Sequence, residues 1–174
     1  MIQTNTAAGL QWKWRQPAAF KRFHEMTCDG EVVCTLQFSG VCGSPATLES
    51  PYGSWTFRRG GFLTPRITAR KAGESDGTAV FLGKWTGGGE LRFARGESYT
   101  LKCRSFWFGD WAFENSRGET LLVLHGPHGF LKQQGEIVVN SAGDVAELTL
   151  LAALAWYIRL LMVEEAAATS VIIS

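Results

Sequence analysis

The segment 144–165, DVAELTLLAALAWYIRLLMVEE, is the most apolar part of this chain and constrains its fold more than any other feature. It contains no Gly or Pro and is rich in Leu and Ala, which favours a helix. Asp144 and Glu147 have the spacing of a capping box at a helix start. We therefore expect a helix over 144–164, about 20 residues and roughly 30 Å long. Such a helix is either a membrane span or the centre of a folded domain.

Charges in and around this segment argue against a membrane span. Asp144 and Glu147 precede the apolar run and Glu164 and Glu165 follow it, whereas membrane anchors usually carry Lys or Arg on the cytoplasmic side. Arg159 lies inside the segment, where a charge is costly in lipid. The charge-free stretch between Glu147 and Arg159 spans about 17 Å, short of the roughly 30 Å bilayer core. We therefore favour a helix enclosed by protein, with a C-terminal tail anchor as the alternative.

The rest of the chain shows the period-two alternation of strands with one buried face. In LKCR, for example, Leu101 and Cys103 share one face, and Lys102 and Arg104 share the other. Gly-rich segments such as RRGGF, TGGGE and NSRGE separate the runs and suit tight hairpins. The predicted strands are 10–15, 31–38, 54–59, 62–71, 78–86, 90–95, 98–105, 110–115, 119–125, 129–134 and 136–140. Residues 17–26 are expected to form a short helix or an irregular link.

Eleven or twelve strands with one apolar face each must hide those faces from water. If they close into one barrel, its bore is too wide for side chains alone to fill, since about eight strands is the limit. A helix that is apolar on all sides is expected to be surrounded completely. We therefore predict a mainly β fold, a closed antiparallel barrel of about twelve strands around a buried hydrophobic C-terminal helix. The length of 174 residues predicts a single domain over 1–174.

Composition limits the class of protein. Hydrophobic residues make up 45% and charged residues 19%, which indicates a globular chain. The formal net charge of +1 lacks the basic field of a nucleic-acid binder, so no nucleic-acid partner is expected. Cys28, Cys34, Cys42 and Cys103 show no zinc spacing. The start, MIQTNTAAGLQWKW, does not read as a signal peptide, so we expect free thiols in the cytoplasm.

A string of hairpins ending in GDVAELTLLAALAWYIRLLM resembles the tubby C-terminal-like superfamily. That group includes tubby domains, LURP-one-related proteins and phospholipid scramblases. FWFGDWAFENSRGETLLVL followed by GEIVVN is similar to the hairpins that precede the helix in LURP-one-related and bacterial members. The resemblance covers roughly residues 10–163 and implies a closed barrel around a central hydrophobic helix. It also implies a binding role, because tubby domains bind phosphoinositide head groups through basic residues on the barrel surface.

The nearest basic segment is RRGGFLTPRITARK, which contains Arg58, Arg59, Arg66, Arg70 and Lys71. Arg66 and Arg70 share one face of a predicted strand. Two aligned guanidinium groups can grip a phosphate with paired hydrogen bonds. These five residues are therefore the candidate anion or lipid head-group site. The alternative is an ordinary solvated outer face of a barrel.

The segment CRSFWFGDW concentrates aromatic residues at a predicted turn. Phe106, Trp107, Phe108 and Trp111 form a candidate interaction loop, because Trp and Phe are common at interface centres. The alternative is core packing at one end of the barrel.

No motif supports catalysis. His125 and His128 lie three apart in HGPHG, but no further Cys, Asp or Glu follows at metal-ligand spacing. The chain has no G-x-S-x-G elbow, P-loop or G-x-G-x-x-G. We therefore expect a non-enzymatic protein without catalytic residues, metal or cofactor. The expected partner is an anionic phospholipid or another protein, and the expected state is a monomer in the cytoplasm or at the membrane periphery. An enzyme whose site forms only in three dimensions is a further alternative.

Overall fold

The computed structural model describes residues 8–40, 44–61, 65–75, 78–84, 87–105, 109–129 and 131–172, which form twelve strands and one helix. The strands are β1 (Gln11–Arg15), β2 (Phe23–Cys28), β3 (Glu31–Phe38), β4 (Ala46–Ser50), β5 (Gly53–Gly60), β6 (Arg66–Lys71), β7 (Thr78–Gly83), β8 (Gly89–Phe93), β9 (Ser98–Ser105), β10 (Asp110–Asn115), β11 (Thr120–His128) and β12 (Gln134–Val139). The helix α1 is Val145–Ile172.

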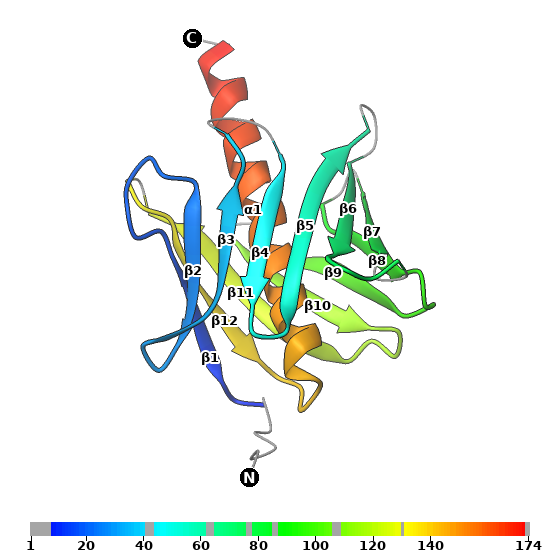
Figure 1. Cartoon of the computed structure of the whole chain (residues 1–174). Helices are drawn as coiled ribbons and strands as arrows, with labels where there is room; N and C mark the ends of the chain where they lie inside the picture. Colours follow the sequence, from blue (N-terminus) through cyan, green and yellow to red (C-terminus); the bar gives the residue numbers. More distant parts are fainter. Residues whose placement is uncertain are drawn as a thin grey trace.

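The strands form one closed barrel with the simplest connectivity. Every strand pairs antiparallel with its neighbours in the chain, and β1 also pairs with β12 (Figure 1). At this closing seam Trp12 lies opposite Ile137, and Trp14 lies opposite Gly135. Closure gives both edge strands a partner, which explains why a long meander leaves no open sheet edge. The predicted fold class is confirmed.

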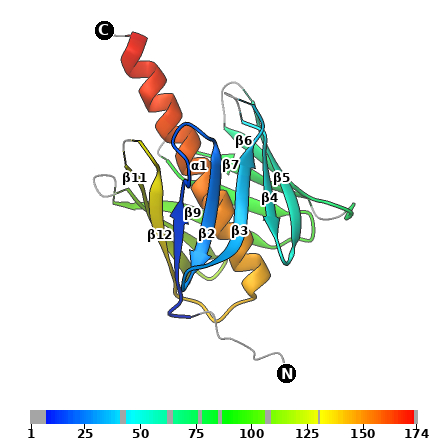
Figure 2. The ribbon, with the colours of Figure 1, turned by 60° about the vertical axis from the view of Figure 1, so that its left-hand side comes forward.

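Helix α1 passes through the middle of the barrel and projects beyond it (Figures 1 and 2). From Leu148 to Leu161 every residue is buried except Arg159, which is half-buried. The prediction of an enclosed helix is therefore confirmed, although the helix continues to Ile172 rather than ending near 164. We call the end of the barrel at Asp144 the entry end and the end from which α1 emerges the exit end.

Aromatic rings fill the space between helix and wall. Trp156 stacks on Trp14 of β1, and Tyr157 stacks on Phe38 of β3 with ring centroids 5.5 Å apart. Gly135 on β12 makes room for Trp156, because a Cβ there would lie 2.6 Å from the indole ring. Large rings on the helix are therefore matched by local recesses in the wall.

Asp144 begins the helix as predicted. Its Oδ1 accepts a hydrogen bond from the Ala146 backbone N–H at 3.1 Å, and its carbonyl accepts one from Leu148 at 2.9 Å. Glu147 does not complete a capping box among the described hydrogen bonds. Its side chain lies near Tyr99 of β9 instead, so the cap consists of Asp144.

The prediction of a helix or irregular link over 17–26 is wrong for its second half, which forms β2. His24 and Met26 point into the core on alternate positions, so the segment obeys period two. Phe20 has φ 65°, which is incompatible with a right-handed helix. Asp29 and Gly30, with φ 51° and 87°, form a two-residue turn into β3. This Asp-Gly pair is a hairpin signal that the sequence analysis missed.

Two further strand predictions need correction. β4 was not predicted, although Ala46 and Leu48 alternate inward. The predicted strand over 129–134 is wrong at 129 and 131–133, because β11 ends at His128 and β12 begins at Gln134, while Phe130 lies outside the described residues. The pairing between these two strands shifts register between His125 and His128, and this irregularity obscured the alternation. Residues 62–64 and 85–86, at the ends of two other predicted strands, lie outside the described residues.

Candidate functional site

The five basic residues predicted as one site lie on two faces of the barrel. Arg58 on β5 and Arg66 and Arg70 on β6 are exposed on the outside. Arg59 and Lys71 lie on the inner faces of the same strands, near opposite ends of the barrel. The alternation of a strand accounts for the division, since neighbouring residues point to opposite sides. Three of the five residues therefore share a surface, and two do not.

We call Arg58, Arg66 and Arg70 the outer arginine surface. Arg58 pairs with Thr68, which lies midway between the two β6 arginines. Arg58 is therefore the diagonal neighbour of both, at roughly 7–8 Å between Cα atoms. Arg66 and Arg70 are about 13 Å apart along their strand, at about 3.3 Å per residue. The spacing lets Arg58 act together with either neighbour on one phosphate.

The outer arginine surface carries uncompensated charge. Among the described residues, none of its three guanidinium groups forms an ion pair. Arg92, on the outside of β8, differs because it pairs with Glu90 at 2.8 Å. Each free guanidinium keeps its full set of planar N–H donors, which suit the oxygens of phosphate and carboxylate.

Arg59 has a structural partner instead. At the exit end it forms an ion pair with Glu165 of the helix. Arg22, which precedes β2, pairs with the adjacent Glu164 at 2.9 Å and lies 4.2 Å above the Phe38 ring. The two acidic residues that argued against a membrane span therefore join the emerging helix to the rim of the barrel.

The prediction that Trp111 belongs to an exposed interaction loop is wrong. This residue is 3% exposed and packs inside the barrel beneath Arg159, whose guanidinium lies 4.8 Å from the ring centroid. Inward alternation on β10 buries it together with Phe113. The other three members of that predicted loop, Phe106, Trp107 and Phe108, lie outside the described residues.

Arg159 is the charge that sequence analysis placed inside the helix, and it has no carboxylate partner among the described residues. Its Nη1 donates to the Met162 sulfur at 3.4 Å, and its buried Nε has no partner there. Burial lowers the pKa of Arg159, while the neighbouring Cys103 acts in the opposite direction. The described contacts that stabilise this guanidinium are its stacking on Trp111 and its hydrogen bond to Met162.

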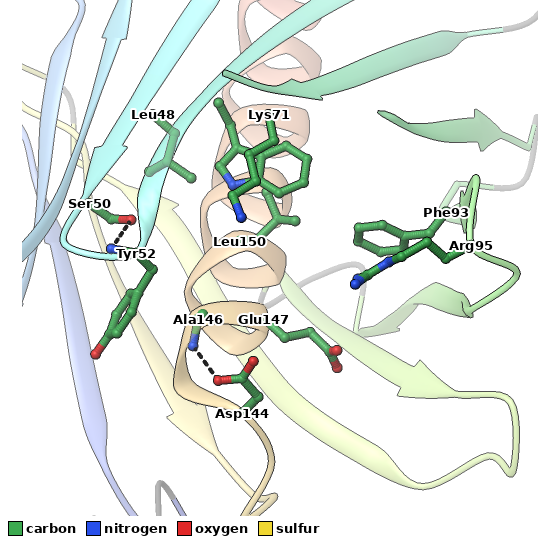
Figure 3. A pocket seen from close by; sticks show the side chains of 11 residues that line it. Leu48, Ser50, Tyr52, Lys71, Phe93, Arg95, Asp144, Ala146, Glu147 and Leu150 are labelled. Carbon is green, nitrogen blue, oxygen red and sulfur yellow. Dashed lines mark hydrogen bonds between the residues drawn. The ribbon is translucent and has the colours of Figure 1, made fainter. Parts of the chain in front are cut away.

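Lys71 lies in a pocket at the entry end, which we call the entry pocket (Figure 3). The pocket has a volume of about 150 Å³ and opens beside the first turn of α1. Its walls come from β4, β5, β6, β8 and α1. The lining residues are Leu48, Ser50, Tyr52, Trp55, Lys71, Phe93, Arg95, Asp144, Ala146, Glu147 and Leu150.

Charges of both signs face the entry pocket. Lys71 pairs with Glu74 at 2.5 Å, and Arg95 lies 3.6 Å from Glu97. Two effects raise the pKa of the Tyr99 hydroxyl: burial is the larger, and a hydrogen bond to Glu147 is the second. The phenol therefore stays protonated. Lys71 faces this pocket and not the predicted anion site, and no pocket was predicted here. In the sequence, the feature that pointed to this pocket was the pair of acidic residues at the helix start, Asp144 and Glu147.

In the described part of the chain, potentially reactive side chains form a His–Asp pair but no metal-binding cluster. His125 Nδ1 lies 2.7 Å from Asp110 Oδ1, and the described residues contain no group of three metal-ligating side chains. Cys28, Cys34 and Cys103 are free thiols, and Cys42 is outside the described residues. Burial raises the pKa of Cys34 to about 12, which keeps this thiol protonated and weakly nucleophilic.

Comparisons with known proteins bear on the fold. No family model matches this chain, and no curated protein sequence matches it. The chain is similar to the X-ray structure of the Arabidopsis thaliana protein AT5G01750, with a TM-score of 0.57 and 10% sequence identity. The likeness covers 90% of this chain and 96% of that one. At this identity it establishes the fold alone, and a twelve-stranded barrel with a C-terminal helix fits the tubby-like fold in general.

Proposed function

We propose that this domain is a non-enzymatic, tubby-like binding module that docks its outer arginine surface on phosphate-bearing head groups at a membrane. The observation that carries the proposal is the grouping of Arg58, Arg66 and Arg70 on one outer face, without acidic partners among the described residues. Their diagonal spacing suits one phosphate held by two guanidinium groups. The resemblance to tubby domains supports phosphoinositides as the head groups.

A bilayer surface suits this geometry better than a single soluble ligand. The three arginines stand on the outer wall of a barrel and are exposed to solvent. An anionic leaflet presents many phosphates at once and attracts each nearby Lys or Arg by about 1 kcal/mol. The proposed location is therefore the cytoplasmic face of a membrane, with the domain bound at its periphery.

The alternative of a tail anchor is disfavoured by the position of α1. This helix is long and apolar enough to cross a bilayer, but 72% of its most apolar 18-residue stretch is buried inside the barrel. To span a membrane it would have to leave the barrel and expose the apolar inner faces of the strands. That exposure is costly at about 25 cal/mol per Å².

Vesicle co-sedimentation tests the proposal. The wild-type chain is compared with the triple variant Arg58→Gln, Arg66→Gln, Arg70→Gln on phosphatidylcholine vesicles with and without a phosphoinositide. At about 1 kcal/mol per residue, the triple variant should bind anionic vesicles roughly a hundredfold more weakly. Binding should also weaken as salt concentration rises.

A second triple variant with the same change in net charge provides the control. Lys13→Gln, Lys21→Gln and Arg117→Gln remove exposed cations from other parts of the barrel. This variant should retain most of the binding. Equal losses in the two variants would show that only net charge matters, and failure of the wild-type chain to bind any anionic vesicle would reject the proposal.

A further inference from the structure

We propose that the entry pocket binds a small zwitterion that carries an apolar group, of which an apolar α-amino acid is the simplest example. The pocket lies at the entry end, inside the wall whose outer side carries the arginine surface. It does not depend on membrane binding, so the two proposals stand or fall separately.

The floor of the entry pocket is apolar and well ordered by packing. Leu48, Phe93 and Leu150 are 1%, 8% and 4% exposed, and Trp55 packs edge-on against Phe93 with ring centroids 6.5 Å apart. Such a floor accepts an aliphatic or aromatic group and removes it from water. It offers little to a small ion without an apolar part.

Opposite charges enter the pocket from different elements. Lys71 reaches in from β6, whereas Asp144 and Glu147 lie at the first turn of α1 (Figure 3). Arg95, which follows β8, adds a second cation at the mouth. A ligand with only a negative charge would be repelled by the two carboxylates, and a ligand with only a positive charge would be repelled by Lys71 and Arg95. A ligand with both charges is complementary to the two sides at once.

The charged groups keep hydrogen-bonding capacity for a ligand. The Lys71 ammonium has three donors, and its described partner is the single Glu74 oxygen. The Glu147 carboxylate has two acceptor oxygens, and its described partner is the single Tyr99 hydroxyl. A carboxylate and an ammonium can therefore be bound without breaking either internal contact.

The size of the entry pocket limits the ligand. A volume of about 150 Å³ is below the roughly 300–1,000 Å³ of pockets for drug-sized molecules. A pocket of this size suits a ligand as small as a free amino acid better than a nucleotide or a peptide of several residues.

Three matched probes test the proposal on the full chain by following amide resonances in NMR titrations. L-leucine carries both charges, isocaproate lacks the ammonium group, and isoamylamine lacks the carboxylate. Leucine should shift the resonances of Lys71, Phe93 and Glu147 and should bind at least about tenfold more tightly than either relative. Equal binding of the three probes, or no leucine-dependent shift at these residues, would overturn the proposal.

Two variants then assign the charges. Lys71→Met should weaken leucine binding about tenfold without weakening isoamylamine binding, because it removes a charge that repels this cation. Glu147→Gln should weaken leucine binding without weakening isocaproate binding, because it removes a charge that repels this anion. Lys13→Met and Glu136→Gln are matched controls, since these exposed residues pair across β1 and β12 on the outside of the barrel. Loss of leucine binding in the controls would contradict the assignment. The wild-type NMR spectrum identifies any variant that fails to fold.

Discussion

Trp156 of α1 stacks on Trp14 of β1, with ring centroids 5.5 Å apart and ring planes 2° from parallel. The contact joins the last element of the chain to the first strand. It also covers the closing seam, because Trp156 fits over Gly135 of β12, and Gly135 pairs with Trp14. Barrel closure and insertion of the helix therefore depend on the same side chains.

Removing the Trp156 ring should destabilise the whole domain. Trp156→Ala leaves a large cavity in the core and should lower the free energy of unfolding by about 3–5 kcal/mol. That loss is a large part of a typical total of about 5–15 kcal/mol. Urea denaturation provides the measurement. Phe20→Ala, at a residue that is 90% exposed, should change stability by less than about 0.5 kcal/mol, and a similar small effect at Trp156 would contradict the role of this stack.

His24 should make stability depend on pH. Burial, aided by Arg22, lowers the pKa of His24 from 6.5 to about 4. Between these values the unfolded chain binds a proton that the folded domain does not, so the free energy of unfolding should fall as pH drops from 6.5 to 4. The loss from this group is about 3 kcal/mol, with no further change below the folded pKa.

The difference between wild type and His24→Leu isolates this effect from the titration of carboxylates. The variant should lose the His24 contribution to the slope over that pH range, as measured by urea denaturation at a series of pH values. Phe20→Leu, at an exposed residue without a titratable group, should keep the wild-type slope. Parallel curves for wild type and His24→Leu would show that the histidine is not held neutral.

Two C-terminal truncations should behave in opposite ways. Residues 166–171 are exposed beyond the exit end, so a chain ending at Glu165 should fold and keep both rim ion pairs. A chain ending at Gly143 lacks the central helix and should not fold, because the inner faces of the strands lose their apolar partner. Circular dichroism and thermal melting distinguish the two. A well-folded soluble barrel without residues 144–174 would contradict the enclosed helix.

Arg159 should contribute little to stability despite its central position. Its guanidinium is half-buried without a carboxylate partner among the described residues. Arg159→Met removes the desolvation cost, and a thioether can still pack on Trp111. The melting temperature should stay the same or rise. Arg22→Met, which breaks the pair with Glu164, should instead lower the stability by about 1 kcal/mol. A loss of more than about 1 kcal/mol in Arg159→Met would show that the cation–π contact dominates.

Much of the architecture could be predicted from local pattern. The alternation in 31–38, 98–105 and 110–115 reproduces β3, β9 and β10, because one-sided burial imposes period two directly on the residues. β2 was missed because the polar His24 occupies an inward position and the Asp29–Gly30 turn was overlooked. β4 was missed because it offers only two inward apolar residues, Ala46 and Leu48. In these places the local signal was mixed and tertiary packing determined the outcome.

The candidate sites were less predictable than the fold. Alternation separates Arg58 from Arg59, but only the closed barrel brings Arg59 to Glu165 and leaves Arg58 beside the β6 arginines. Trp111 looked like an interface residue because its exposure depends on which face of β10 meets the helix. The entry pocket joins strands and helix that are up to about a hundred residues apart in the chain, and no local pattern indicates such a contact.

The sequence alone predicts that the apolar part of 144–165 lies inside a β barrel, and the structure encloses Leu148–Leu161 in this way. An all-round apolar helix with acidic flanks needs an enclosing wall, and alternating strands need a filler, so each feature implies the other. Which charges remain free depends on the tertiary structure. Glu164 and Glu165 form ion pairs with Arg22 and Arg59. Arg58, Arg66 and Arg70 have no acidic partner among the described residues. Local periodicity specifies which face a residue occupies, but the pairing of charges depends on strand register and barrel closure, which are set by contacts distant in the chain.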